Sequence, residues 1–235
     1  MAGDQRQPQI HRGNGGDGDP ALQPPQGAVS LTGNADVVLA SASRSRHQIL
    51  QNAGVAHVCD PADIDEGEIR DAFRKDGSGA AAAALALARA KAEAVARRHP
   101  GALVIGADQI LESDGRWFEK PKDAADAAAT LKALAGSTHR LISAVAVSRD
   151  DGTAWEHVET ARLTMRRLSD ADIGRYLKDA GPAVLESVGA YRLEGIGARL
   201  FTAIDGDYFT ILGLPLLPLL GFLRAASAID RPGAF

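Results

Sequence analysis

The chain has 235 residues, of which 45% are hydrophobic and 24% are charged, as in an ordinary globular protein of one large or two small domains. Its formal net charge of −4 excludes a basic surface for a nucleic-acid polymer, although a locally basic nucleotide site stays compatible with it. The most apolar segment, 211–223, is interrupted by Gly213, Pro215 and Pro218 and is too short to span a bilayer. We therefore expect no membrane partner.

Residues 1–34 are rich in Gly, Gln, Pro and Asp and contain almost no large apolar side chain, which predicts a disordered extension. This segment also lacks the apolar core of a secretory signal. The folded domain is expected over 35–228, followed by a flexible tail over 229–235. The single cysteine, Cys59, excludes an intramolecular disulfide and favours a cytoplasmic location; we expect it to be a small buried side chain and not a nucleophile.

Hydrophobic spacing and turn residues predict strands and helices that alternate along the chain. The predicted strands cover 37–40, 56–59, 103–107, 117–118, 141–148 and 154–166, with two short ones around Tyr191 and Phe201. The predicted helices cover 46–53, 80–98, 124–134, 169–180 and 215–228. Because Asp114-Gly115 and Asp151-Gly152 are hairpin signals, we expect an α/β fold whose twisted sheet is mixed and flanked by helices.

Polar residues follow the predicted strands where they end. Asp108 comes directly after the apolar run 103–107, and the hydroxyls and arginines of 41–46 come after 37–40. Lys120 lies in a turn before Pro121. Open α/β sheets bind ligands at strand ends, and a carboxylate among hydroxyls and cations suits a metal-bound polyphosphate.

Eight motifs, in this order, resemble the Maf family of nucleotide pyrophosphatases over roughly residues 37–223. They are LASASRSR at 39–46, DIDE at 63–66, AKA at 90–92, GADQ at 106–109, EKP at 119–121, LAGSTH at 134–139, GAYRLEGIG at 189–197 and GDYFTILGLP at 206–215. The resemblance implies two lobes around a central cleft, as in the related inosine-triphosphate pyrophosphatases, and a homodimer. It also implies that nucleoside triphosphates, often modified ones, are hydrolysed to the monophosphate and pyrophosphate with a divalent cation, Mg²⁺ or Mn²⁺.

The same resemblance assigns roles to particular residues. It implies catalytic roles for Asp108, Lys91 and Lys120, and metal binding by Glu66 together with Asp108. It implies substrate binding by Ser41, Ser43, Ser45, Arg46, Gln109 and Glu194.

The residue chemistry leaves a plainer alternative open at most of these positions. Asp108 can act as a general base on water, or it can cap the next turn. Glu66 can hold a cation, or it can be one more charge on a solvated acidic loop. The serines can donate to phosphate beside the Arg46 guanidinium, or they can cap a helix. Lys91 can reach a cleft from its alanine-lined helix, or it can lie on the surface.

Specificity stays open. Gln109 and Glu194 match the subgroup similar to 7-methyl-GTP pyrophosphatase, but that subgroup has a tryptophan where this chain has Ser45, which cannot stack on a base. Two other classes also remain: a nucleotide-binding regulator of septum formation in cell division, and a phosphatase that releases orthophosphate. His139 is expected to be a structural hydrogen-bonding residue and not a metal ligand.

Overall fold

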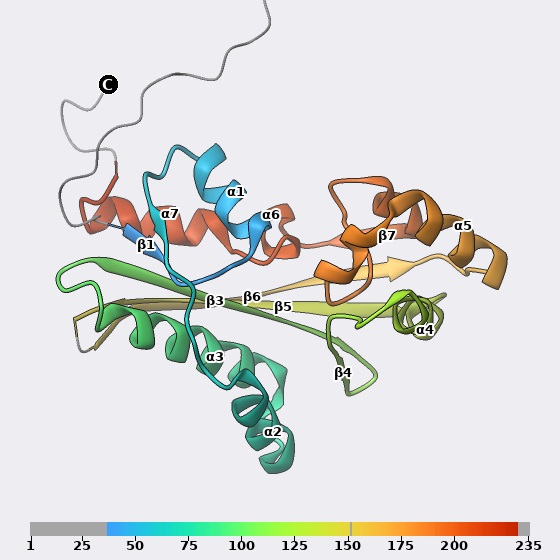
Figure 1. Ribbon diagram of the computed structural model, residues 1–235, viewed down its shortest axis with the longest axis horizontal. Coiled ribbons are helices and arrows are strands. Elements are labelled where there is room, and N and C mark those ends of the chain that lie inside the picture. The colour runs from blue at the N-terminus through green and yellow to red at the C-terminus, as the bar shows by residue number, and fades with distance from the viewer. Residues whose placement is uncertain (1–36, 151, 230–235) are drawn as a thin grey trace, which may run out of the picture. The chain divides into compact units, whose positions relative to one another are not determined.

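The computed structural model describes residues 37–150 and 152–229, which form one sheet with helices on both of its faces (Figure 1). The expected extension over 1–34 and all but the first residue of the expected tail lie outside the described residues. None of the helices in the described ranges is long and apolar enough to cross a membrane.

The sheet is mixed, as the hairpin signals predict. Its strands are β1 (Val37–Leu39), β2 (Val58–Cys59), β3 (Leu103–Ser113), β4 (Arg116–Phe118), β5 (Thr138–Arg149), β6 (Gly152–Met165) and β7 (Phe201–Asp205). They lie in the order β2-β1-β3-β5-β6-β7, and β4 pairs with β3. β1 runs parallel to β2 and β3, whereas the remaining pairs are antiparallel.

The helices cover the sheet on two sides (Figure 1). They are α1 (Arg44–Asn52), α2 (Glu66–Asp76), α3 (Gly79–Ala96), α4 (Ala124–Leu134), α5 (Asp170–Ala180), α6 (Tyr208–Ile211) and α7 (Leu216–Ala225), with 3₁₀ turns at Pro182–Glu186 and Ile196–Leu200. α1 and α7 lie on one face of the sheet, and α3 lies on the other face with α2 beside it. The expected mixed sheet flanked by helices is confirmed.

Four local predictions are wrong. The strand predicted over 103–107 does not end before Asp108; β3 continues to Ser113. Tyr191 lies in no strand; it sits between the two 3₁₀ turns, where its ring packs in the core. The helix α2 was not expected, because its side chains include no fully buried residue and so give no strong apolar spacing. Cys59 is exposed, because β2 is the edge strand of the sheet.

Helix α3 packs tightly on β3, and this contact depends on Gly106. A Cβ atom at Gly106 would lie only 2.0 Å from the carbonyl oxygen of Ala88 and 2.7 Å from the backbone nitrogen of Ala92. A side chain there would force the helix away from the strand. The alanines of α3 and the glycine of β3 together allow the backbone of the helix to lie directly against the strand.

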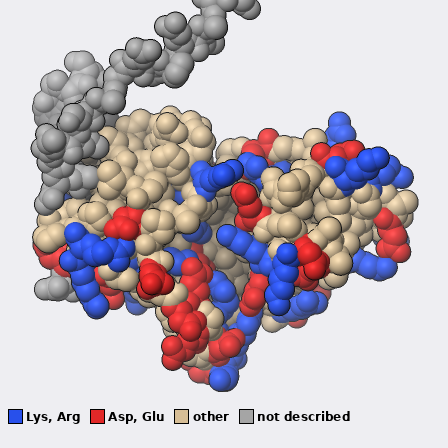
Figure 2. All heavy atoms as spheres, viewed as in Figure 1, with Lys and Arg blue, Asp and Glu red and all other residues tan. Residues whose placement is uncertain are grey.

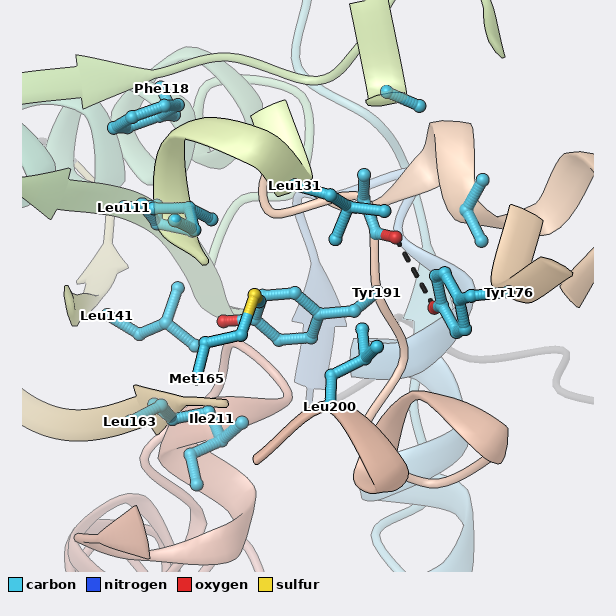
Figure 3. Packing of buried hydrophobic residues seen from close by; sticks show 14 of the residues in the cluster. Leu111, Phe118, Leu131, Leu141, Leu163, Met165, Tyr176, Tyr191, Leu200 and Ile211 are labelled. Atoms are coloured by element: carbon cyan, nitrogen blue, oxygen red, sulfur yellow. Dashed lines mark hydrogen bonds between the residues drawn. The ribbon is translucent and has the colours of Figure 1, made fainter. Parts of the chain in front are cut away.

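A cluster of buried hydrophobic residues packs against α4 and α5 (Figure 3). Its centre is Tyr191, whose hydroxyl lies 2.7 Å from Nε2 of the fully buried His139. Burial raises the pKa of Tyr191 and lowers the pKa of His139 to about 4. Nδ1 of His139 has no hydrogen-bond partner among the described residues, so the neutral imidazole is the form that fits. His139 is thus structural, as expected.

Gly106→Ala is expected to lower the free energy of unfolding by about 3 kcal/mol, because the new methyl group overlaps the backbone of α3. Urea unfolding followed by circular dichroism measures the change. Gly174→Ala is the matched control: nothing lies within 4 Å of a Cβ there, so this helical position should gain up to about 1 kcal/mol. Equal effects at both positions would contradict the tight contact.

Stability is expected to fall as the pH drops from about 6.5 to about 4. In that window the unfolded chain protonates His139 while the folded chain keeps it neutral, so acid favours unfolding by up to about 3 kcal/mol. Urea unfolding from pH 8 to pH 5 tests this at pH values above the titration of most carboxylates. His139→Gln should flatten the slope, and His157→Gln should not; a slope unchanged in His139→Gln would refute the assignment.

Candidate active site

A cavity of about 610 Å³ opens in the described domain, and all ten residues proposed from the sequence line it. They are Ser41, Ser43, Ser45, Arg46, Glu66, Lys91, Asp108, Gln109, Lys120 and Glu194. Figure 2 shows acidic and basic side chains side by side around a hollow near the centre of the face that is drawn. Segments that are far apart in the sequence thus meet at one site, although each contributes to it differently.

The loop after β1 positions two hydroxyls and a guanidinium. Ser43 caps α1, since its Oγ accepts from the backbone nitrogen of Arg46 at 3.4 Å. The Arg46 side chain donates from Nε to the carbonyl oxygen of Gly213 at 2.8 Å and from an Nη to Oγ of Ser41 at 3.1 Å. Burial lowers the pKa of Arg46, while the charges of Asp108 and Glu66 act in the opposite direction. A buried, oriented cation therefore stands beside the hydroxyls.

Lys91 joins the two carboxylates of the site. Its Nζ lies 2.7 Å from Oδ1 of Asp108 and 2.9 Å from Oε1 of Glu66. Asp108 is only 4% exposed, and Lys91 is 7% exposed. The close contact at Gly106, two residues before Asp108 on the same face of β3, brings α3 near enough for this pair. Neither residue is a plain surface charge or a turn cap: Asp108 lies inside a strand that continues to Ser113.

Glu66 is the first residue of α2, next to the capping residue Asp65. Burial would raise the pKa of Glu66, but Lys91, Arg70 and Arg46 outweigh it and lower the pKa. The carboxylate is therefore ionised at neutral pH. Glu66 belongs to the cavity and not to a solvated acidic loop.

Gln109 points to the opposite face of β3 from Asp108, because successive side chains alternate along a strand. Its Nε2 donates to Oγ of Ser143 at 2.9 Å and to the carbonyl oxygens of Thr210 and Ile211, each at 3.1 Å. These bonds tie β3 to β5 and α6. Gln109 thus shapes the cavity wall, and its carboxamide nitrogen is already occupied by protein acceptors.

The remaining predicted residues lie at the cavity rim. Ser45 is half-buried and Lys120 is exposed. Glu194 accepts from Nε of Arg192 at 2.9 Å, and the two side chains form an ion pair. A ligand that uses Glu194 must therefore share it with Arg192.

Two arginines of the cavity were missed by the sequence reasoning, Arg70 and Arg192. Arg70 contacts Glu66 at 3.2 Å and approaches Oδ2 of Asp108 at 3.9 Å. The four-residue spacing of Glu66 and Arg70 is a helical ion-pair spacing and would have indicated both α2 and this cation. Arg192 lies in the 189–197 motif, where only Glu194 was singled out.

The oxygen donors of Glu66 and Asp108 fit a divalent cation. Both carboxylates converge on the Lys91 ammonium, so they are placed to share one positive charge. Oδ2 of Asp108 is buried and has no hydrogen-bond partner among the described residues. Hard carboxylate oxygens of this kind suit Mg²⁺ or Mn²⁺.

Lys91→Met is expected to lower the free energy of unfolding by about 3 kcal/mol, because it leaves the Asp108 carboxylate buried without its ammonium partner. The double variant Lys91→Met/Asp108→Asn should recover most of this loss in urea unfolding. Lys132→Met is the matched control, since its ion pair with Asp170 is exposed and should be worth about 0.5 kcal/mol. A double variant as unstable as Lys91→Met alone would contradict the role of the pair.

Comparison with known proteins places the chain among relatives of similar length. The model of the family described as Maf-like protein matches residues 36–226. A 7-methyl-GTP pyrophosphatase of Rhizobium etli is 51% identical over 83% of this chain and 98% of its own. A nucleoside triphosphate pyrophosphatase of Paramagnetospirillum magneticum is 50% identical over 80% of this chain and 96% of its own.

Among the solved structures that match is a nucleoside-triphosphatase described as a dITP/XTP pyrophosphatase from Mycobacterium abscessus. It is 19% identical and covers 82% of this chain and 96% of its own, with a TM-score of 0.36, a likeness too weak to bear on fold or function. The family match and the relatives at about half identity are sufficient in themselves: the chain belongs to the family of Maf-like proteins.

Proposed function

We propose that the protein is a metal-dependent nucleoside triphosphate pyrophosphatase that cleaves the α–β phosphoanhydride, releasing the monophosphate and pyrophosphate. The observation that carries the proposal is Asp108, a buried carboxylate that has one oxygen on Lys91 and one without a hydrogen-bond partner among the described residues. It faces a cavity lined by cations and hydroxyls. The printed names of the two relatives agree with this chemistry.

In this proposal Asp108 is the general base. Its Oδ2 accepts a proton from a water molecule as the water oxygen attacks the α-phosphorus. The bond from the α-phosphorus to its bridging oxygen breaks, and pyrophosphate leaves with the electron pair. Lys91 donates to Oδ1 and so keeps the carboxylate oriented.

The cations of the cavity bind and orient the phosphates. Arg46, held by Gly213 and Ser41, presents its guanidinium beside the Ser41 and Ser43 hydroxyls. Lys120 at the rim neutralises charge that develops on the leaving pyrophosphate. Positioning and electrostatic stabilisation of this kind account for most of the catalysis in phosphoryl transfer.

Glu66 and Asp108 would hold the divalent cation, Mg²⁺ or Mn²⁺. When bound, the cation supplies positive charge to the phosphate oxygens that the protein's cations do not cover. The Glu66 carboxylate is ready for that role, because Lys91, Arg70 and Arg46 keep its pKa low.

The base of the nucleotide is a finer proposal. Specificity for 7-methyl-GTP is the leading alternative to a broader preference for modified nucleotides, since the Rhizobium etli relative carries that name. Glu194 could meet a positively charged purine, in competition with Arg192. The homodimer and the cytoplasmic location stay predictions.

Pyrophosphate release from a panel of nucleotides tests the proposal. The panel contains 7-methyl-GTP, GTP, UTP, dTTP and CTP, assayed with Mg²⁺, with Mn²⁺ and with EDTA. Release is expected with a metal and not with EDTA, and Asp108→Asn should lower kcat roughly 10²- to 10⁴-fold because the base is lost. Asp170→Asn, an exposed carboxylate on α5, is the control that should keep full activity.

Three outcomes contradict the proposal in different ways. Orthophosphate in place of pyrophosphate would identify a phosphatase. Activity that survives Asp108→Asn would remove the base. Nucleotide binding without turnover, in folded protein with either metal, would favour a nucleotide-binding regulator of cell division.

A further inference from the structure

Three metal-ligating side chains meet at the edge of the sheet, on residues that do not line the cavity. His47 lies on α1, His57 precedes β2 and Cys59 ends β2. Their ligand atoms all lie within 4.8 Å of one another. Because ten and twelve residues separate His47 from the other two, the fold and not the local sequence brings them together.

Two of the three separations between the ligand atoms are close to those around one zinc ion. Nδ1 of His47 lies 2.9 Å from Nε2 of His57 and 3.4 Å from Sγ of Cys59. Tetrahedral zinc with ordinary bond lengths holds two nitrogens about 3.3 Å apart and a nitrogen and a sulfur about 3.5 Å apart. The third pair, Nε2 of His57 and Sγ of Cys59, lies within 4.8 Å, and because the His47 and Cys59 side chains are exposed they can adjust to close the coordination.

The orientation of His57 supports a ligand role. Its Nδ1 lies 2.7 Å from the carbonyl oxygen of Val55. A carbonyl only accepts, so Nδ1 carries the proton and Nε2 presents its lone pair to the cluster. Metal-binding histidines are typically held in this way by a backbone carbonyl on the second nitrogen.

We propose that His47, His57 and Cys59 form a zinc site that leaves the fourth position to water. Two imidazoles and a thiolate are the donors that zinc prefers, whereas Mg²⁺ and Mn²⁺ prefer oxygen donors such as those of Glu66 and Asp108. Without metal, Nδ1 of His47 carries the proton that it shares with Nε2 of His57; when zinc binds, the His47 proton resides on Nε2 of the same ring, and the Cys59 thiol releases its proton to solvent. The chain thus has two metal sites of different chemical preference.

The zinc site links α1 to β2. His47 directly follows Arg46 and lies in the first half of α1, whose N-terminus Ser43 caps. Zinc therefore fixes the turn that holds the substrate-side serines and Arg46. Since zinc binds the folded arrangement, it should raise the melting temperature.

The test uses the full chain without a histidine tag and titrates it with zinc and with cobalt(II). Wild type is expected to bind one equivalent at this site and to show the near-ultraviolet thiolate-to-cobalt band of a sulfur ligand. His47→Gln, His57→Gln and Cys59→Ser should each weaken zinc binding at least about tenfold, and Cys59→Ser should also lose the band. His157→Gln, a histidine outside the cluster, should bind as wild type does.

Two further measurements keep the result decisive. Asp108→Asn should retain the cobalt band, which separates this site from the carboxylates. In wild type alone, zinc should slow alkylation of Cys59 by iodoacetamide, so the answer does not depend on a variant that folds. No thiolate band in wild type, zinc affinity unchanged in all three variants, or alkylation unaffected by zinc would each overturn the proposal.

Discussion

The buried ion pair of Lys91 and Asp108 is the constraint on which the site depends. An ionised carboxylate inside a β-sheet is costly unless a partner charge lies within reach, and the partner here comes from a helix on the same face. That reach requires the helix to lie against the strand, which the glycine two residues earlier permits. The packing of α3 on β3 therefore determines the chemistry of the site, because the small residues of both elements allow the two charged groups to be buried together.

Much of the fold follows from the sequence because the strong signals are local. The helix over 124–134 is found at its expected bounds, and the Ser169 cap begins α5 where the capping residues indicate. The misses have physical causes. The sequence predicts that the strand beginning at Leu103 ends at residue 107, because the polar pair Asp108 and Gln109 interrupts the apolar run. In the structure the pairing of β3 with β5 continues through both residues. Tyr191 has strand-like neighbours but is held in an irregular segment by the core around it.

The sequence predicts which residues line the candidate site, but not which partners those residues contact. Predicted strand ends and family motifs indicated ten side chains that line one cavity. No sequence periodicity indicates that the Gln109 amide donates to backbone carbonyls of α6, or that Arg192 forms an ion pair with Glu194. Such partners come from segments about a hundred residues away or from irregular loops. The cluster at Cys59 was missed for the same reason: its histidines have no metal-binding spacing in the sequence, and an edge strand beside a helix creates the proximity.

The hydrogen bond from Arg46 to the Gly213 carbonyl spans 167 residues, and this has a consequence for shortened chains. All seven described strands end by Asp205, before the acceptor of Arg46 and before α7. A chain cleaved between Asp205 and Gly213 would therefore keep every described strand, but its Arg46 guanidinium would lose the backbone anchor, and the apolar face that α7 covers would be open to solvent. Such a cut would remove the geometry of the phosphate-side wall while leaving the strands of the sheet in the chain.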